Sequence, residues 1–238
     1  MTWSILARDS NGFFGVAIAS RFFSVGSLCI HTRRGIGAIA TQALMNPLYG
    51  PAGLDLLAQG QGAAEVIAAL VAGDDGRAQR QLHVLPAGGV GAAHTGAECV
   101  DWCGHLLRDG FSVAGNMLAG ARVIEATADA FANSKGVDLA ERLLDAMDAG
   151  EAAGGDKRGK QSAALRIHRD EDYLALDLRV DDHEDPLREL RRLHGVSLER
   201  FQPFLSCLPG RGRPSGTIDR LAIEATIERF HARRKGRA

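Results

Sequence analysis

The residue whose type and position best suit covalent chemistry is Thr2, near the start of the chain. A threonine hydroxyl is a weak nucleophile that needs an adjacent base. If Met1 is removed, the α-amine of Thr2 can be that base, because a terminal amine with an ordinary pKa of about 7.7–8.0 is partly neutral near pH 7. The alternative is an ordinary second residue leading into a strand, and the Met-Thr dipeptide alone favours it. Ser4, on the same side of an expected strand, would support Thr2 rather than replace it.

Other polar side chains stand where strand-like segments end. Asn116 follows an apolar run and can donate a hydrogen bond to a developing oxyanion. N-capping of the next helix explains Asn116 equally well. Arg21 follows the second expected strand and can bind a substrate carboxylate or neutralise Asp156. Gln42 and Asn46 flank the end of the fourth expected strand and can line a pocket, although a solvent-facing role suits each of these three residues as well.

Histidine and carboxylate groups give weaker signals. His94 ends a strand-like segment and can contact a substrate, although a lone histidine is more often structural. The run Asp181, Asp182 and His183, followed by Asp185, resembles a metal-ligand set. Asp185 is better explained as a helix cap and the others as a strand exit, so no metal site is expected. The glycine-rich run at 88–91 lacks the lysine or the fingerprint of a nucleotide site, and no cofactor is expected.

Alternating strand and helix patterns must position these residues. The turn sequence at 9–12 predicts a hairpin of strands 3–8 and 13–19. These strands and those at 27–31 and 36–42 are apolar at nearly every position, as in strands buried on both faces. Proline at 186 after Asp185 predicts the start of a helix. The remaining pattern predicts helices around 54–58, 66–71, 121–133 and 138–147, strands at 81–85, 90–94, 111–113, 162–168 and 174–180, and a final helix at 217–234.

Composition limits the class of protein. The chain has 238 residues and a formal net charge of −1, so no overall field favours nucleic acid or a membrane as partner. The last thirty residues carry eight Lys/Arg and three Asp/Glu, most simply a solvated helix face. The N-terminal segment lacks the features of a signal peptide, and no apolar stretch could span a bilayer. The four cysteines are expected to be structural thiols, so the sequence predicts a cytoplasmic protein.

Seven segments together resemble a bacterial family known mainly as a domain of unknown function, which is placed in the N-terminal-nucleophile (Ntn) hydrolase superfamily with proteasome subunits and several amidases. The resemblance spans about 2–193, and the tail from about 195 falls outside it. We therefore expect an Ntn-hydrolase-like domain at 1–194 and a helical extension at 195–238. The segments are 2–9 (TWSILARD), 19–26 (ASRFFSVG), 40–51 (ATQALMNPLYGP), 93–96 (AHTG), 110–118 (GFSVAGNML), 153–165 (AGGDKRGKQSAAL) and 178–183 (LRVDDH).

The resemblance implies an α+β fold, a four-layer αββα sandwich, with the nucleophile on the first residue of the first strand. It favours the catalytic interpretation of Thr2. Superfamily members place an Asp and a Ser near the terminal amine in a comparable turn and strand, which implies that Asp156 orients the ammonium and Ser162 relays its proton. Arg158 and Gln161 belong to the same turn and would contact the substrate, whereas a solvated charged loop is the alternative for the whole turn.

The expected function is hydrolysis of an amide bond in a small molecule, with Thr2 as nucleophile and Asn116 as oxyanion donor. The alternative is a catalytically silent scaffold of the same fold that binds a metabolite or serves as an assembly subunit, because fold does not fix function. The final helix spreads apolar residues over more than one face, which predicts a homo-oligomer that shares it. These residues are Ile218, Leu221, Ile223, Ala225, Ile227 and Phe230.

Overall fold

The computed structural model describes residues 2–134 and 138–236. Met1, whose removal the nucleophile hypothesis requires, lies outside these ranges. The chain divides into two compact units, Met1–Leu190 and Arg191–Ala238. In the described part of the chain, no helix combines the length and apolar composition needed to cross a membrane.

The first unit contains two antiparallel sheets. The six-stranded sheet has the order β10-β9-β2-β1-β8-β7, and the four-stranded sheet has the order β3-β4-β5-β6. The strands are β1 (Thr2–Arg8), β2 (Phe14–Ser20), β3 (Ile30–Arg33), β4 (Gly37–Ala43), β5 (Arg80–Pro86), β6 (Ala92–Thr95), β7 (Gly104–Arg108), β8 (Phe111–Asn116), β9 (Ser162–His168) and β10 (Leu176–Val180).

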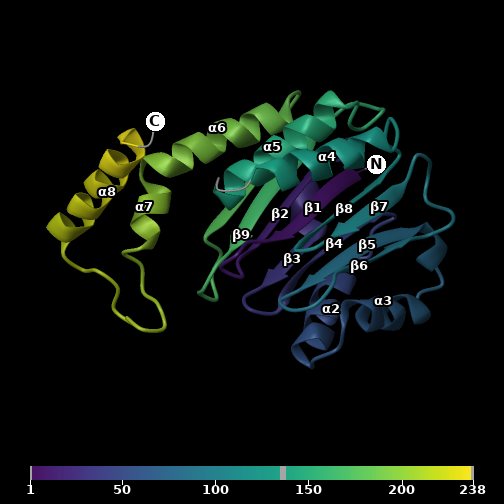
Figure 1. The fold of residues 1–238 in the computed structure, drawn as a ribbon, viewed down its shortest axis with the longest axis horizontal. Coiled ribbons are helices and arrows are strands. Elements are labelled where there is room, and N and C mark those ends of the chain that lie inside the picture. Colours follow the sequence, from purple (N-terminus) through teal and green to yellow (C-terminus); the bar gives the residue numbers. More distant parts are fainter. Residues whose placement is uncertain (1, 135–137, 237–238) are drawn as a thin grey trace. The chain divides into compact units, whose positions relative to one another are not determined.

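Helices accompany both sheets. The elements of the first unit are α1 (Val25–Leu28), α2 (Tyr49–Ala58), α3 (Ala63–Ala72), the 3₁₀ turn η1 (Arg77–Gln79), α4 (Arg122–Asn133), α5 (Leu139–Ala152) and the first part of α6 (Pro186–Glu199). Helices α4 and α5 pack together and against β1, β2, β8 and β9, whereas α2 and α3 pack against the four-stranded sheet (Figure 1). The fold is therefore mixed α+β, with helices on each sheet.

The two sheets face each other through β1, β2, β4, β5 and β8. Leu6, Val16 and Ile18 of the larger sheet join Ile30, Ala40 and Leu85 in one buried cluster. A second cluster fills the space between the smaller sheet and α2 and α3. Every residue of β2 is buried, and β1 is buried from Thr2 to Ala7. Removing apolar side chains from water on both faces is the main force that holds such strands in place.

Most predicted elements are confirmed, although several differ in their bounds or type. The predicted hairpin is present, with Thr2 opposite Ser20 and Arg8 opposite Phe14. The segment predicted as a strand at 27–31 begins in the short helix α1, and only Ile30 and His31 join β3. The predicted strand at 90–94 starts at Ala92. Strand β7, which pairs with β8, has no counterpart in the prediction.

The second unit comprises the end of α6, α7 (Phe201–Leu205) and α8 (Arg220–Lys235). Helices α7 and α8 contact each other, and Arg200 forms an ion pair with Glu224. Asp219 caps α8 by accepting a hydrogen bond from the backbone N–H of Leu221. Ile227 is the residue of α8 that is buried.

Candidate functional site

Four polar side chains form a row across the end of the six-stranded sheet. Thr2 on β1 lies opposite Asn116 on β8 and opposite Ser20 on β2, and Ser20 in turn lies opposite Ser162 on β9. Side chains of directly opposed residues in antiparallel strands share one face of the sheet. Ser4, two residues after Thr2, contacts Gln42 and His83 of the other sheet. The row therefore faces the space between the sheets, at the end where the chain begins.

Thr2 is held on both sides. Its side-chain Oγ1 lies 3.1 Å from the Oγ of Ser20. Its carbonyl oxygen accepts hydrogen bonds of 3.4 Å from the amide groups of Gln42 and Asn116. Only 6% of the residue is exposed. A hydroxyl in these surroundings has a fixed position and a second hydroxyl within hydrogen-bond distance.

Gln81 on β5 joins the two amides that touch Thr2. Its Oε1 accepts hydrogen bonds from Gln42 (2.8 Å) and from Asn116 (3.0 Å). Its Nε2 lies 2.9 Å from the carbonyl oxygen of Gly115 and 2.9 Å from the Oγ1 of Thr95. Gln81 is fully buried. The sequence placed this residue in a strand but gave no sign of its role, because its partners come from distant segments.

A second chain of hydrogen bonds runs inward from Gln42. Ser4 donates its hydroxyl hydrogen to the Oε1 of Gln42 at 2.7 Å, so the Ser4 oxygen must accept from the Nε2–H of His83 at 2.9 Å. The Nδ1 of His83 then accepts from the hydroxyl of Ser112 at 2.8 Å. This pattern assigns one neutral tautomer to His83. Burial accordingly lowers the pKa of His83 to about 3.

Asp156 lies at the same end of the sheet as Thr2. It forms an isolated bridge with Leu118, two residues after Asn116. Its carboxylate accepts hydrogen bonds from the backbone N–H of Arg21 (2.9 Å) and of Arg158 (2.8 Å). Arg21 directly follows Ser20. The carboxylate is buried and lies 3.5 Å from the Arg158 guanidinium. Among the described residues, no hydrogen bond joins Asp156 directly to Thr2.

The remaining residues of the 153–162 segment have local partners. Ser162 donates to the carbonyl oxygen of Phe22 at 2.5 Å and accepts from the backbone N–H of Val25 at 3.1 Å, which ties α1 to β9. Gln161 donates to Asp182. Arg158 is half-exposed, and its guanidinium also donates to the carbonyl oxygen of Arg21. These bonds hold the glycine-rich turn against the ends of β2 and β10.

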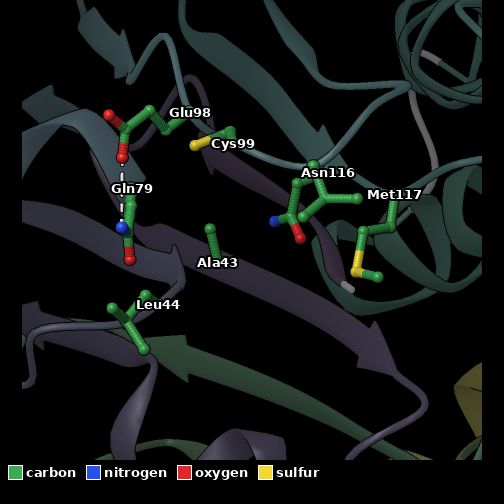
Figure 2. A pocket seen from close by; sticks show the side chains of 8 residues that line it. Ala43, Leu44, Gln79, Glu98, Cys99, Asn116 and Met117 are labelled. Atoms are coloured by element: carbon green, nitrogen blue, oxygen red, sulfur yellow. Dashed lines mark hydrogen bonds between the residues drawn. The ribbon is translucent and has the colours of Figure 1, made fainter.

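A pocket of about 350 Å³ opens beside Asn116 (Figure 2). Ligand sites in proteins usually occupy about 300–1,000 Å³, so the pocket has room for a small group. Glu98 accepts a hydrogen bond from Gln79 at one side of it. The lining residues are Ala43, Leu44, Gln79, Glu98, Cys99, Val100, Asn116 and Met117.

Two residues of this pocket have unusual backbone conformations. Ala43, the last residue of β4, has φ of 67°, and Met117, directly after β8, has φ of 52°. Left-handed conformations cost a residue with a side chain about 1–2 kcal/mol. Such strain persists where the surroundings enforce it, and it is common at binding and catalytic sites. The sequence gave no signal for either conformation, because neither residue is glycine or asparagine.

Asn46 and His94 lie in other surroundings. Asn46 donates to Asp74 and accepts from the backbone N–H of Leu48, so both ends of its amide have local partners. His94 contacts the carbonyl oxygen of Arg77 at 2.9 Å. Neither residue belongs to the pocket lining. Contact of either residue with a substrate therefore stays a prediction.

Asp74 is the centre of a polar cluster near Asn46. It forms an ion pair of 2.9 Å with Arg80 and accepts a hydrogen bond of 2.6 Å from Tyr49. Arg80 and Tyr49 hold the pKa of the Asp74 carboxyl well below its usual range. Burial and the neighbouring carboxylate raise the pKa of Tyr49 to about 12. Arg80 also donates to the carbonyl oxygen of Leu44, and so fixes one wall of the pocket.

Titratable groups elsewhere do not assemble into a metal centre within residues 2–134 and 138–236. In the 181–185 segment, the three aspartates contact other side chains. Asp181 pairs with Arg179, Asp182 accepts from Gln161, and Asp185 pairs with Lys160.

Comparison with known proteins places the chain in a family. Residues 2–190 match a family described as a family of unknown function, DUF1028. The crystal structure of protein SPO2555 from Silicibacter pomeroyi, a DUF1028 protein, is 29% identical with a TM-score of 0.85, and covers 92% of this chain and 96% of that chain. No curated protein matches the sequence.

Two further solved structures are more distant. Anbu (ancestral beta-subunit) from Yersinia bercovieri is 13% identical with a TM-score of 0.40, over 87% of this chain and 98% of that chain. Anbu from Hyphomicrobium sp. strain MC1 is 13% identical with a TM-score of 0.40, over 82% of this chain and 94% of that chain. Likeness at this level supports no conclusion about activity. The match over residues 2–190 is sufficient by itself, and the chain belongs to the DUF1028 family.

Proposed function

We propose that this protein is an Ntn-type hydrolase that cleaves an amide bond of a small molecule, with Thr2 as nucleophile after removal of Met1. We further propose that its first unit is the four-layer αββα sandwich of that class. The position of Thr2 carries the proposal. It begins a central strand, its hydroxyl lies 3.1 Å from Ser20, and the flanking Asn116 borders a pocket.

The reaction has two halves. The Thr2 oxygen attacks the amide carbon, its proton passes to the α-amine, and the carbonyl electron pair moves to oxygen. Collapse of this intermediate breaks the C–N bond, and the leaving amine takes the proton. Water then attacks the acyl ester, a proton from the water passes to the Thr2 oxygen as its bond to the acyl carbon breaks, and the carboxylic acid leaves. The chemistry requires no redox partner, since oxidation states are unchanged throughout.

The surrounding groups have distinct parts in this proposal. Ser20, rather than Ser162, would relay the proton, since Ser20 contacts the Thr2 hydroxyl whereas Ser162 donates to the backbone. Asp156 would favour the ammonium form of the amine through its negative charge. Asn116 would stabilise the oxyanion. Both of its amide hydrogens already have acceptors, Gln81 and Thr2, so one of these bonds must be released in that step.

The engaged amide of Asn116 is also the observation that favours a second function, a silent scaffold that binds a metabolite. A pocket with no available oxyanion donor would bind a ligand without turning it over. This alternative and the hydrolase share the pocket and differ only in what happens at Thr2.

The decisive experiment follows Thr2 itself. Intact mass of the purified protein first establishes whether Met1 has been removed. A lactone probe should then add its mass once per chain, on the peptide that begins with Thr2. Thr2→Ser should retain partial turnover of an amide panel, and Thr2→Ala should fold but lose both turnover and labelling. Retention of Met1, or equal labelling of Thr2→Ala, would refute the nucleophile assignment.

A further inference from the structure

Thr2 on β1 has β8 on one side and β2 on the other. These two flanks of Thr2 differ in chemical character. On the β8 side lies the pocket, whose walls include Leu44, Val100 and Met117. Leu44 and Val100 are 56% and 54% exposed. Cys99 is buried there, and burial raises the pKa of its thiol, so it adds a neutral surface. This flank suits an apolar group.

Among the described residues that line the pocket, Glu98 alone is charged. Glu98 is exposed, and its Oε2 accepts a hydrogen bond from Gln79 across 3.1 Å (Figure 2). Glu98 would repel an anionic group that entered the pocket. An uncharged aliphatic chain, by contrast, gains free energy from covering exposed leucine and valine surface.

The opposite flank is basic. Arg21 follows Ser20 on β2, its side chain is exposed, and no hydrogen bond or ion pair within the described residues engages its guanidinium. Arg158 donates to the carbonyl oxygen of Arg21, so the two residues are neighbours. Asp156 balances only one of these charges. Guanidinium groups in this arrangement bind carboxylates well.

The spacing of the flanks suits one molecule. The strands run β2-β1-β8, so the basic and apolar flanks are separated by two interstrand spacings, about 10 Å. An amide between them would have its acyl chain on the pocket side and its amine half on the arginine side. Thr2 lies on the strand between the flanks.

We infer that the substrate is an N-acyl amino acid, an amide that joins a short aliphatic acid to an α-amino acid with a free carboxylate. The acyl chain would occupy the pocket, and Arg21 and Arg158 would bind the carboxylate. This inference rests on the proposed function for its reaction, but its recognition elements can be tested by binding alone.

Calorimetric titration of the Thr2→Ala protein tests recognition without turnover. The ligands are N-hexanoylglycine, N-acetylglycine with a short acyl group, and N-methylhexanamide, which keeps the hexanoyl group and lacks the carboxylate. N-hexanoylglycine should bind about tenfold or more tightly than either analogue, since each lacks one recognised half. Equal affinity for all three ligands, or no binding of any, would overturn the inference.

Variants assign each half of the ligand to its flank. Arg21→Gln should reduce the affinity for N-hexanoylglycine about tenfold and leave that for N-methylhexanamide unchanged. Val100→Asp should reduce the affinity for both hexanoyl ligands. Matched controls are Arg33→Gln and Val90→Asp, since Arg33 is a half-exposed arginine at the far end of β3 and Val90 is 77% exposed. Equal losses in the controls would refute the assignment.

The outcomes separate this inference from the proposed function. If N-hexanoylglycine binds as described but protein with an unblocked Thr2 never hydrolyses it, recognition is upheld and the hydrolase proposal fails. If the protein hydrolyses neutral amides as well as N-hexanoylglycine, with equal kcat/KM, the hydrolase proposal is upheld and the inference fails. Steady-state kinetics of the unmutated protein provides this second readout should Thr2→Ala fold poorly.

Discussion

Asn116 illustrates how one side chain can have two roles that mutation distinguishes. Asn116 and Gln42 both donate hydrogen bonds to the carbonyl oxygen of Thr2 and to the Oε1 of Gln81. Of these two amides, only Asn116 lines the pocket. We predict that Asn116→Ala lowers kcat by roughly 10²–10³-fold, the usual effect of losing an oxyanion donor. Gln42→Ala is the matched control and should lower kcat much less.

The comparison is made by steady-state kinetics together with thermal melting of both variants. If both amides serve only to hold the Thr2 carbonyl oxygen, the two variants should show similar reductions in melting temperature and in kcat. Equal reductions of kcat in Asn116→Ala and Gln42→Ala would therefore show that Asn116 only anchors Thr2.

His83 makes a prediction about pH. Its pKa is about 3 in the folded protein and ordinarily 6.5, because burial disfavours the charged ring. Between these values the unfolded chain binds a proton that the folded chain does not, so the free energy of unfolding falls as pH falls from about 6.5 toward 3. His83 contributes a slope of roughly 1 kcal/mol per pH unit.

His83→Gln should remove this contribution while keeping one donor and one acceptor. Urea unfolding between pH 5 and pH 7 measures the slope for each protein, and the other histidines remain as an internal reference. The variant is expected to be less stable at pH 7 but to lose stability less steeply on acidification. Parallel slopes would show that His83 is protonated in the folded protein.

At the scale of secondary-structure elements, the sequence predicted best where local signals and burial agree. The turn at 9–12 and two apolar runs were sufficient for the β1–β2 hairpin, and α5 begins after its N-cap Asp138, where a helix was predicted to start. Helix α1 was missed because four residues show no helical periodicity. Strand β7 was missed because it is a short, partly exposed strand at the edge of its sheet.

The candidate site was harder to predict from the sequence than the helices and strands were. Thr2, Asn116 and Asp156 were predicted to converge, and the strand register and the Leu118 bridge bring them to one end of the sheet. The hydrogen bonds among Gln42, Gln81 and Asn116 join residues from three strands of two sheets. No periodicity encodes contacts of that kind, since they depend on how the sheets face each other.

The cluster around Asp74 leads to a prediction about how α2 is attached to β5. Arg80 and Asp74 have side chains only 17% and 13% exposed. Arg80→Met would leave a poorly solvated carboxylate without its cation, and should lower the free energy of unfolding by about 1–3 kcal/mol. Arg33→Met removes the ion pair between Arg33 and Asp55, whose side chains are 41% and 61% exposed. This loss should lower the free energy of unfolding by less than about 1 kcal/mol.

Denaturant unfolding at pH 7 compares these two variants. A similar small loss of stability in Arg80→Met and Arg33→Met would mean that water solvates the Asp74 carboxylate in place of Arg80. Because Arg80 also donates to the carbonyl oxygen of Leu44, Arg80→Met should in addition weaken ligand binding in the pocket. That second effect has no counterpart in the Arg33 control, which lies away from the pocket lining.

At the scale of the whole molecule, the second unit presents apolar residues that its own helices do not cover. Ile218, just before α8, and Leu221, in its first turn, are 84% and 81% exposed, whereas Ile227 is buried. Single exposed apolar residues are common, but two neighbours on a short unit are typical of a contact surface. We predict that the protein is a homo-oligomer in which this end of α8 contributes to the interface.

Light scattering of the full chain tests that prediction. Ile218→Lys combined with Leu221→Lys should reduce the mass per particle, because a charged group buried at an interface without a partner is costly. Truncation before Pro209, which removes α8, should have the same effect. Leu48→Lys is the matched control, since Leu48 is 75% exposed in the first unit. If the double variant and the truncated chain keep both the mass per particle and the solubility of the original protein, α8 has no part in assembly.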